Sequence, residues 1–444
     1  MEIQSKTGRG WLWICLAVLV TVPGLFVRFF ALKQVEYDTP LWGSFLFGLS
    51  VIGAAFLLAW ATEAAQADVP KALAISVMAL IAVLPEYAVD FALTFQAGSD
   101  PAYQQFAVAN MIGANRMIVG FAWPLLVFIF ALKFRQRAIR LGKGQRVEIG
   151  FLLFAGLYSL IIPIKGQIDF IDFGVFLGLF VLYSLRLMKA EVHEPELVGP
   201  AKLLGDLARP KRIGAVAALI LFAGTVIFLV AHPFAVSLIE TGTRLGVDQV
   251  FLLQWFAPLA SEAPEIVICI IFTLRFMAAE GLGALVASKV NQWTLLVGTL
   301  PLVFSLGSGT MRALPLSGTY LENGQTQAFN LAGPMLVTSA QTLLAVMVIL
   351  SLRMTLGGAF LLFGLLIAQF IVPERIGTLD SEYLFAGIYL AISAGLAVIK
   401  VRHFVPVLRS MVSPGYVKAQ TIEEEEEKGL EVKAPGRFVT TPKA

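Results

Sequence analysis

Charged residues are scarce in this sequence: Asp, Glu, Lys and Arg make up only 14% of its 444 residues, whereas 58% are hydrophobic. A soluble domain contains about 25% charged residues. A chain with so few charges cannot cover a surface that faces water, and its mean hydropathy of +0.80 agrees with this. The composition therefore predicts an all-α, polytopic membrane protein.

Cysteine and histidine are also rare. The two cysteines, Cys15 and Cys269, lie in apolar runs and indicate neither a disulfide framework nor a metal site. The three histidines are scattered along the chain and give no metal constellation. Because H-E-x-x-H and G-x-S-x-G motifs are absent as well, we predict no enzyme activity and no cofactor. No basic block is interleaved with aromatic residues, which argues against a nucleic-acid partner.

Long apolar segments dominate the chain. A helix that crosses a bilayer needs about 20 apolar residues. Asp68 and Pro70 separate the second segment from the third, and the first is too long for the core of a signal peptide. The twelve expected spans are residues 11–32, 41–66, 70–97, 105–133, 147–164, 168–188, 213–240, 248–277, 281–308, 326–351, 354–373 and 382–400.

Basic residues gather in particular loops. Residues 133–146 hold six basic residues and no acid, and the linker 189–212 contributes further lysines and arginines. Twelve spans with a cytoplasmic N-terminus place both loops in the cytoplasm, as the positive-inside rule requires. We therefore expect a multi-pass protein of the cell (inner) membrane with both termini in the cytoplasm. The run of glutamates at 423–427 predicts a solvated acidic tail.

Two distant stretches of the sequence resemble each other. IAVLPEYAVDFALTF, at 81–95, and FAPLASEAPEIVICIIF, at 256–272, both place a Pro-Glu pair inside an apolar helix. The stretches 108–128 and 284–304 that follow them share a polar cluster and similar endings. In the expected topology the two Pro-Glu helices run in opposite directions, so the repeats are inverted. Inverted repeats with interrupted helices are the architecture of secondary transporters.

The repeats divide the chain into six expected parts. Each repeat has five helices, and one extra helix stands at each end. The parts are an extra N-terminal transmembrane helix (1–40), the first repeat (41–188), a cytoplasmic linker (189–211), the second inverted repeat (212–373), an extra C-terminal helix (374–404) and the acidic tail (405–444).

Each Pro-Glu pair brings two kinds of oxygen to one depth. Pro85 and Pro264 each free the backbone carbonyl four residues earlier, and a carboxylate follows directly. Carbonyl and carboxylate oxygens are the ligands that hard cations such as Na⁺ and Ca²⁺ prefer. A carboxylate at the bilayer centre costs about 2.5–3.5 kcal/mol, which marks it as functional. We expect Glu86 and Glu265 to form a central cation site across the pseudo-two-fold axis and to exchange a cation for protons.

Further polar residues are expected to contribute at similar depth. Asp90 lies on the same helix face as Glu86 because four residues separate them, and Glu262 lies near Glu265 on the other helix. The neutral candidates for cation or proton binding are Ser261, Ser288, Asn115, Asn291 and Gln292. Asn110 also supplies an oxygen at this depth, and an interhelical hydrogen bond is the alternative to a ligand role for it and for Asn115, Ser288, Asn291 and Gln292.

Two basic residues, Arg116 and Lys289, stand in corresponding helices of the two repeats. A buried base in a membrane faces a partner or water, and the four acids named above are the expected partners. We hypothesise that Arg116 or Lys289 takes the electrostatic role of a bound Na⁺, which leaves a pocket with a formal charge of −2. The alternative is that both lie at helix ends and snorkel to the interface.

The motifs resemble those of the Ca²⁺/cation antiporter superfamily, which includes the sodium/calcium exchangers. Members carry T-S-x-P-E and G-S-N-x-x-N/D in each inverted repeat. Here the first motif reads AVLPE at 82–86 and SEAPE at 261–265, and the second reads GANRMI at 113–118 and ASKVNQ at 287–292. The resemblance covers about residues 41–373 and is nearest to the divergent bacterial branch described as sodium:proton exchanger-like.

This resemblance implies a secondary active antiporter that exchanges Ca²⁺, Na⁺ or another small cation for H⁺ or Na⁺ by alternating access. Its partners would be small inorganic cations and the lipid bilayer. Ala82, Val83 and Ala114 replace hydroxyl residues of the family motifs, so the identity of the ion does not carry over. A cation channel and a non-transporting membrane receptor on the same fold stay open as alternatives. No oligomeric state is indicated.

Overall fold

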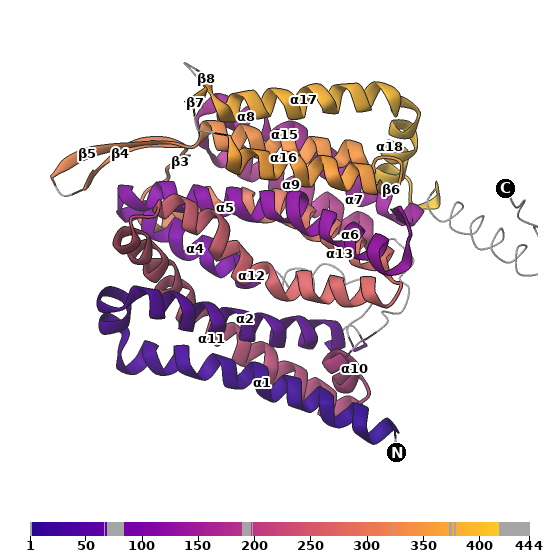
Figure 1. The fold of residues 1–444 in the computed structure, drawn as a ribbon, viewed down its shortest axis with the longest axis horizontal. Helices are drawn as coiled ribbons and strands as arrows, with labels where there is room; N and C mark the ends of the chain where they lie inside the picture. The colour runs from indigo at the N-terminus through magenta and orange to yellow at the C-terminus, as the bar shows by residue number, and fades with distance from the viewer. Residues whose placement is uncertain are drawn as a thin grey trace, which may run out of the picture.

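Most helices of the protein run along one common direction (Figure 1). The computed structural model describes residues 2–65, 67–68, 84–188, 197, 199–322, 324–372, 375–376 and 379–416, with side chains from residue 10 onward. Within these residues, ten helices are long and apolar enough to cross a membrane, and α16 is a shorter apolar helix.

The first half of the chain contains the following elements in order: α1 (Glu2–Phe30), η1 (Gln34–Asp38), α2 (Pro40–Ala65), α4 (Leu84–Ser99), η2 (Pro101–Tyr103), α5 (Gln104–Met117), η3 (Ile118–Ala122), α6 (Trp123–Phe134), β1 (Ala138–Arg140), η4 (Lys143–Gln145), α7 (Arg146–Ser159), α8 (Ile161–Lys165), β2 (Gln167–Ile168) and α9 (Phe170–Leu187).

The second half continues with α10 (Gly199–Gly205), α11 (Arg209–Leu245), α12 (Gln249–Leu274), α13 (Ala278–Asn291), η5 (Gln292–Leu296), α14 (Val297–Ser308), β3 (Leu314–Pro315), β4 (Ser317–Glu322), β5 (Gln325–Asn330), α15 (Ala332–Ile349), β6 (Arg353–Thr355), α16 (Leu356–Ile371), β7 (Arg375–Ile376), β8 (Leu379–Asp380), α17 (Ser381–Ile399), η6 (Val401–His403) and α18 (Phe404–Val412).

Each of the twelve expected spans has a helical counterpart, with two differences. The first part of the expected span 70–97 lies outside the described residues, and α4 covers the remainder. The expected span 326–351 is wrong at its start, because residues 325–330 form strand β5 of a hairpin with β4. The Asn323-Gly324 sequence is the strongest short-range hairpin signal, and Gly324 has a φ of 78°. The polar residues 325–327 that follow this turn therefore belong to a hairpin strand rather than to a membrane helix.

Two short strand pairs tie the repeats together. β1, between α6 and α7, pairs with β6, between α15 and α16. β2, between α8 and α9, pairs with β3, between α14 and α15. Each pair joins the turn after the third helix of one repeat to the turn after the fourth helix of the other. Two inverted repeats that are related by a two-fold axis make reciprocal contacts of this kind.

The molecule has two distinguishable ends. The start of α1, α18 and β6 lie at one end, called here the terminal end, and β3 with the β4–β5 hairpin lies at the other, the hairpin end (Figure 1). The first and last described helices therefore reach the same end, as an even number of crossings requires. The basic residues of 133–146 surround β1, which pairs with β6 and so belongs to the terminal end.

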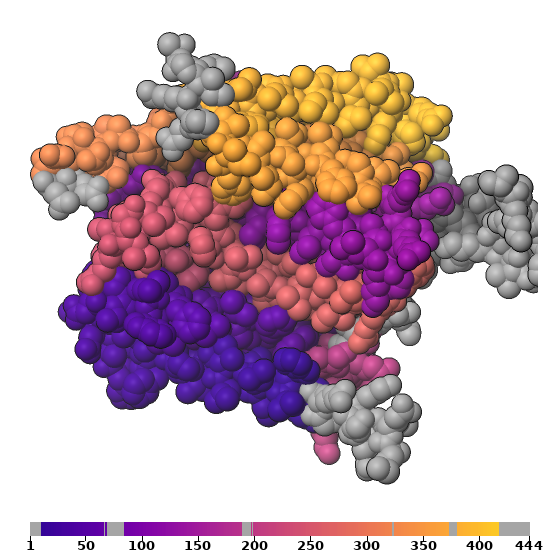
Figure 2. All heavy atoms as spheres, viewed as in Figure 1, coloured from indigo at the N-terminus to yellow at the C-terminus, as the bar shows by residue number. Residues whose placement is uncertain are grey.

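The helices form layers across the bundle. α1, α2 and α11 lie on one side, α15, α16 and α17 lie on the other, and α4, α5, α12 and α13 lie between them (Figure 1). The surface shows the same order, from indigo N-terminal helices to yellow C-terminal ones (Figure 2). The Pro-Glu helices thus occupy the interior of the bundle.

Helix α12 corrects the expectation of interrupted Pro-Glu helices. It runs continuously from Gln249 to Leu274 with both prolines inside. Pro258 removes the donor for the carbonyl of Gln254, and Gly113 of α5 leaves room for this carbonyl, since a Cβ there would lie 1.7 Å from it. The proline is absorbed by close helix packing rather than by unwinding. The stretch before Leu84 in the first repeat lies outside the described residues.

Two π-helical turns instead interrupt the helices that carry the polar clusters, and a third, η1, lies between α1 and α2. η3 separates α5 from α6, and η5 separates α13 from α14. They occupy corresponding helices of the two repeats, directly after the polar clusters. A π turn inserts an extra residue and occurs often at functional sites, because it re-aims the side chains around it.

The strand pairs predict which positions share a side of the membrane. In a background without native cysteines, Arg140→Cys and Arg353→Cys should react with a membrane-impermeant maleimide from one side. Gln167→Cys and Thr319→Cys should react from the opposite side. All four side chains are exposed. Labelling of Arg140→Cys and Arg353→Cys from different sides would contradict the fold.

An ion pair at the terminal end of α2 makes a prediction about acid stability. Asp68 accepts hydrogen bonds from the Arg212 guanidinium, one of them at 2.7 Å. This contact holds the pKa of Asp68 below its usual 3.8. The stabilisation is therefore present above that value and is lost as the pH falls through the lower pKa of the folded protein.

Accordingly, Asp68→Asn should lower the Tm of the purified protein at neutral pH, and the difference from wild type should shrink below pH 3.8. The drop should be small, since exposed ion pairs contribute little. Asp206→Asn, at an exposed position nearby, is the control. A Tm difference that persists unchanged in acid would refute the role of the ion pair.

Candidate functional site

One amide joins two glutamates at the centre of the bundle. Nε2 of Gln292 donates to Oε2 of Glu86 at 2.8 Å and also to Oε1 of Glu262. Glu86 comes from α4 in the first repeat, Glu262 from α12 in the second, and Gln292 from the first position of η5. Both glutamates are only 3% exposed. The two repeats thus share a buried pair of carboxyl groups.

The third glutamate, Glu265, lies beside this pair and is half-buried. Its Oε2 accepts a hydrogen bond from Oγ of Ser288 at 3.1 Å. Glu86 and Glu265 interact electrostatically. Sequence reasoning expected Glu86 to face Glu265, but it is Glu262 that shares a donor with Glu86. The reason is helical geometry: Glu262 stands about one turn before Glu265, on the part of α12 that Gln292 reaches.

Lys289 is fully buried and is held by neutral oxygens. Its Nζ donates to the backbone carbonyl and to Oδ1 of Asn115, both at 2.6 Å. The ammonium lies 5.3 Å from the centre of the Trp293 ring, a favourable cation–π distance. Glu86 and Glu262 act on it electrostatically. Lys289 therefore lies beside the acidic pocket, bonded to neutral oxygens rather than to a carboxylate.

Arg116 points away from the acidic pocket, contrary to expectation. Its Nη2 donates to Oε1 of Gln369 on α16, and Gln369 donates in turn to the hydroxyl of Tyr389 on α17 at 2.7 Å. The guanidinium also covers the Trp255 ring at 5.3 Å. Arg116 thus connects α5 to the last two long helices. The snorkelling alternative is wrong for both bases, since Arg116 is 7% and Lys289 0% exposed.

The other predicted residues differ in whether they bond a charged side chain. Asn115 and Ser288 bond charged side chains, as described above. The hydroxyl of Ser261 donates to carbonyls of its own helix, at Ala257 and Pro258. Asp90 lies one turn from Glu86 and is fully buried. Asn291 is also buried, and its Oδ1 has no partner.

Several oxygens of the pocket lack hydrogen-bond donors. Oε1 of Glu86, Oε1 of Gln292 and Oδ1 of Asn291 are buried without a partner. A buried polar atom without a partner costs free energy, and oxygen atoms of this kind are ligands for hard cations. In the described ranges, no group of three His, Cys, Asp or Glu side chains is placed to hold a metal ion. The pocket therefore offers mixed carboxylate and amide oxygens rather than a closed carboxylate cage.

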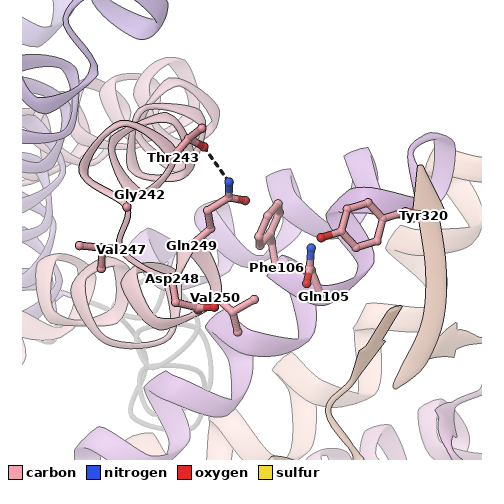
Figure 3. A pocket seen from close by; sticks show the side chains of 10 residues that line it. Gln105, Phe106, Gly242, Thr243, Val247, Asp248, Gln249, Val250 and Tyr320 are labelled. Atoms are coloured by element: carbon pink, nitrogen blue, oxygen red, sulfur yellow. Dashed lines mark hydrogen bonds between the residues drawn. The ribbon is translucent and has the colours of Figure 1, made fainter. Parts of the chain in front are cut away.

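A cavity of about 460 Å³ opens at the hairpin end, apart from these residues. It lies between the start of α5, the α11–α12 turn and strand β4 (Figure 3). Gln105 of α5 and Tyr320 of β4 line one wall, and Gln249 donates to Thr243 at 2.6 Å on the other. The cavity thus reaches the first residues of α5 and α12. The same two helices carry residues of the acidic site around Glu86.

Comparison with known proteins gives a clear match. The profile of the family described as sodium/calcium exchanger protein matches residues 39–189. A crystal structure of the H⁺/Ca²⁺ exchanger CAX is 35% identical in sequence, with a TM-score of 0.82, and the match covers 91% of this chain and 98% of that chain. The chain belongs to the Ca²⁺/cation antiporter superfamily. This confirms the resemblance read from the two Pro-Glu motifs.

A second solved structure, native YfkE, is 13% identical, with a TM-score of 0.53, over 86% of this chain and 99% of that chain. At this identity it supports the fold alone. A search of curated proteins gives no match. The predominantly helical, inverted-repeat fold expected for a superfamily member is confirmed by the CAX match.

Sequence reasoning missed Trp293, which stacks against the Lys289 ammonium. Spacing gives a signal for it, since Trp293 lies four residues after Lys289 on the same face. Asn110, expected as a ligand or an interhelical hydrogen-bond partner, donates to Asp90 of another helix at 2.7 Å.

The contact between Lys289 and Asn115 predicts an energetic coupling between the repeats. Lys289→Met leaves two acceptors of Asn115 without a donor, and Asn115→Ala removes one of them. Each single variant should unfold at a lower temperature than wild type, and a double-mutant cycle should give a coupling of about 1–3 kcal/mol.

Lys202→Met, at an exposed lysine of α10, serves as the control for loss of a lysine. Additive effects of Lys289→Met and Asn115→Ala would show that the contact does not join the repeats.

Proposed function

We propose that the protein is a secondary active cation antiporter that exchanges Ca²⁺, Na⁺ or another small cation for H⁺ or Na⁺ by alternating access. One observation carries the proposal: a single amide, Gln292, bonds carboxyl groups from both inverted repeats. A cation or proton at these carboxyls interacts with both halves of the molecule at once. Its arrival or release therefore alters the contact on which the relative position of the repeats depends.

The formal charge of the pocket suits exchange of a divalent cation for protons. Glu86, Glu262 and Glu265 with Lys289 leave a formal charge of −2 when all are ionised. One Ca²⁺ or two monovalent cations, including protons, neutralise this charge. Arg116 no longer enters the sum, because it bonds Gln369, and Asp90 lies one turn away. The value equals the expected one, but different residues produce it.

Lys289 acts as an internal counter-charge in this proposal. Its ammonium sits among oxygens, as a bound Na⁺ would, and it stays in place during the cycle. Transporters move through states in which the site must be able to bind and release its ion. A fixed positive charge lowers the affinity of Glu86 and Glu262 for a cation. The bound cation is therefore released more easily.

The similarity to the CAX structure, described as an H⁺/Ca²⁺ exchanger, supports Ca²⁺ and H⁺ as the first pair to test. We also propose a location in the cell membrane, with the terminal end of the bundle in the cytoplasm. The cluster of basic residues in 133–146, at the terminal end, supports this orientation.

Transport by purified protein in liposomes tests the function. With Ca²⁺, Na⁺, K⁺ and H⁺ gradients varied one at a time, wild type should move a cation only against a counter-gradient of H⁺ or Na⁺. Glu86→Gln and Glu265→Gln should each lower exchange about tenfold or more, because loss of one charged ligand costs about 1.5–3 kcal/mol.

Glu148→Gln is the matched control, since Glu148 is a buried glutamate near the terminal end of α7. It should exchange at the wild-type rate. Uncoupled current in wild type would favour a channel, and binding without flux would favour a receptor. Full activity of Glu86→Gln together with unchanged pH dependence would refute the antiport mechanism at this site.

A further inference from the structure

A column of buried polar residues continues from Glu86 along α4. Asp90 and Thr94 follow at intervals of four residues, which places all three side chains on one face of the helix. Asp90 and Thr94 are both 0% exposed. At 1.5 Å per residue, Asp90 lies about 6 Å from Glu86 along the helix, toward the hairpin end. The pocket around Glu86 therefore does not contain all the buried polar groups of α4.

Several oxygens in and beside this column lack hydrogen-bond donors. Oδ1 of Asp90 accepts a hydrogen bond from Nδ2 of Asn110 on α5 at 2.7 Å. Oδ2 of Asp90, Oγ1 of Thr94 and Oδ1 of Asn110 are buried without any partner. A carboxylate that is buried with one oxygen unpaired is strongly unfavourable, unless a proton or a cation compensates its charge.

The orientation of Thr94 is a separate observation. Five buried threonines in the described helices donate to the carbonyl four residues earlier, at distances of 2.6–2.9 Å: Thr62, Thr273, Thr294, Thr338 and Thr342. Thr21 donates to the carbonyl three residues earlier, and Thr241 bonds the hydroxyl of Ser44. The hydroxyl of Thr94 makes no such bond. Its oxygen is therefore available for a ligand beside the helix, at one turn from Asp90.

We propose that Asp90, Thr94 and Asn110 form a second cation station, which holds one positive charge between Glu86 and the hairpin end of α4. The proposal rests on the antiport function proposed above and specifies a step of it. An ion that approaches from the hairpin end meets Asp90 before Glu86. The station would load from that side and pass the charge inward along α4.

The donor set defines the class of ligand. One carboxylate with hydroxyl and amide oxygens balances a single charge, so the ligand is Na⁺ or a proton. Ca²⁺ takes six to eight oxygens, typically with several carboxylates. In the described part of the chain, Glu86 and Tyr87 on α4 are the titratable groups coupled to Asp90. Asn110 supplies the contact from α5, and it is neutral.

Ligand-dependent stability tests the station without any gradient. The Tm of the full-length protein in detergent is measured in choline chloride as NaCl is added, at several pH values. A ligand that binds the folded state raises the Tm. If Na⁺ occupies the station, the NaCl midpoint should rise at least about tenfold in Asp90→Asn and in Thr94→Val. If a proton occupies it, the NaCl midpoint should be the same in wild type, Asp90→Asn and Thr94→Val, and only Asp90→Asn should flatten the pH dependence of the Tm.

Ser237→Ala is the matched control for Thr94→Val, because Ser237 also carries a buried hydroxyl without a partner but lies on α11. Wild-type responses to both NaCl and pH in Asp90→Asn would overturn the station. If that variant fails to fold, Asp90→Glu, which displaces the carboxyl by one methylene, replaces it under the same criterion. The liposome flux of Glu86→Gln tests the antiport function, whereas the ligand-dependent Tm of Asp90→Asn tests the station. The two proposals can therefore fail separately.

Discussion

The structure depends on how charged groups are held inside an apolar bundle. Three glutamates and one lysine meet where the repeats cross, and neutral amides and one hydroxyl hold them. Gln292 offers a donor to Glu86 and Glu262, and Asn115 offers acceptors to Lys289. An amide can serve either charge because it carries both a donor and an acceptor. The polar contacts between the repeats are thus made at the same place as the proposed ion site.

The remaining architecture fits this constraint. The π turns η3 and η5 follow the polar clusters of corresponding helices, and Gln292 is the first residue of η5. Gly113 lets α5 approach the backbone of α12 at Gln254. Close backbone contact shortens the distance that a side chain must span between repeats. At the far side, Arg116 and Gln369 connect this core to Tyr389 of α17, so the extra C-terminal helix is joined to the core by buried polar contacts.

Much of the fold was predictable because membrane spanning leaves a strong local signal. Twelve apolar segments, the basic loop at 133–146 and the two Pro-Glu stretches sufficed to predict an inverted-repeat membrane protein. The expectation failed where the signal was mixed, as at 325–330, where polar residues after an Asn-Gly turn form a hairpin strand instead of the start of a helix. It also failed at Pro258 and Pro264, since α12 continues through both prolines, and at Pro258 the freed carbonyl packs against Gly113 of α5.

The sequence by itself determined which residues carry charge in the interior, because an acid or a base within an apolar helix is visible without any structure. Which side chains these charged residues contact was decided only by the tertiary structure. Sequence reasoning paired Glu86 with Glu265 and assigned Arg116 to the acids, whereas Glu86 shares Gln292 with Glu262 and Arg116 bonds Gln369. The physical reason is that a side chain's direction depends on helix rotation, and a π turn or a close helix contact rotates it without changing the residue pattern.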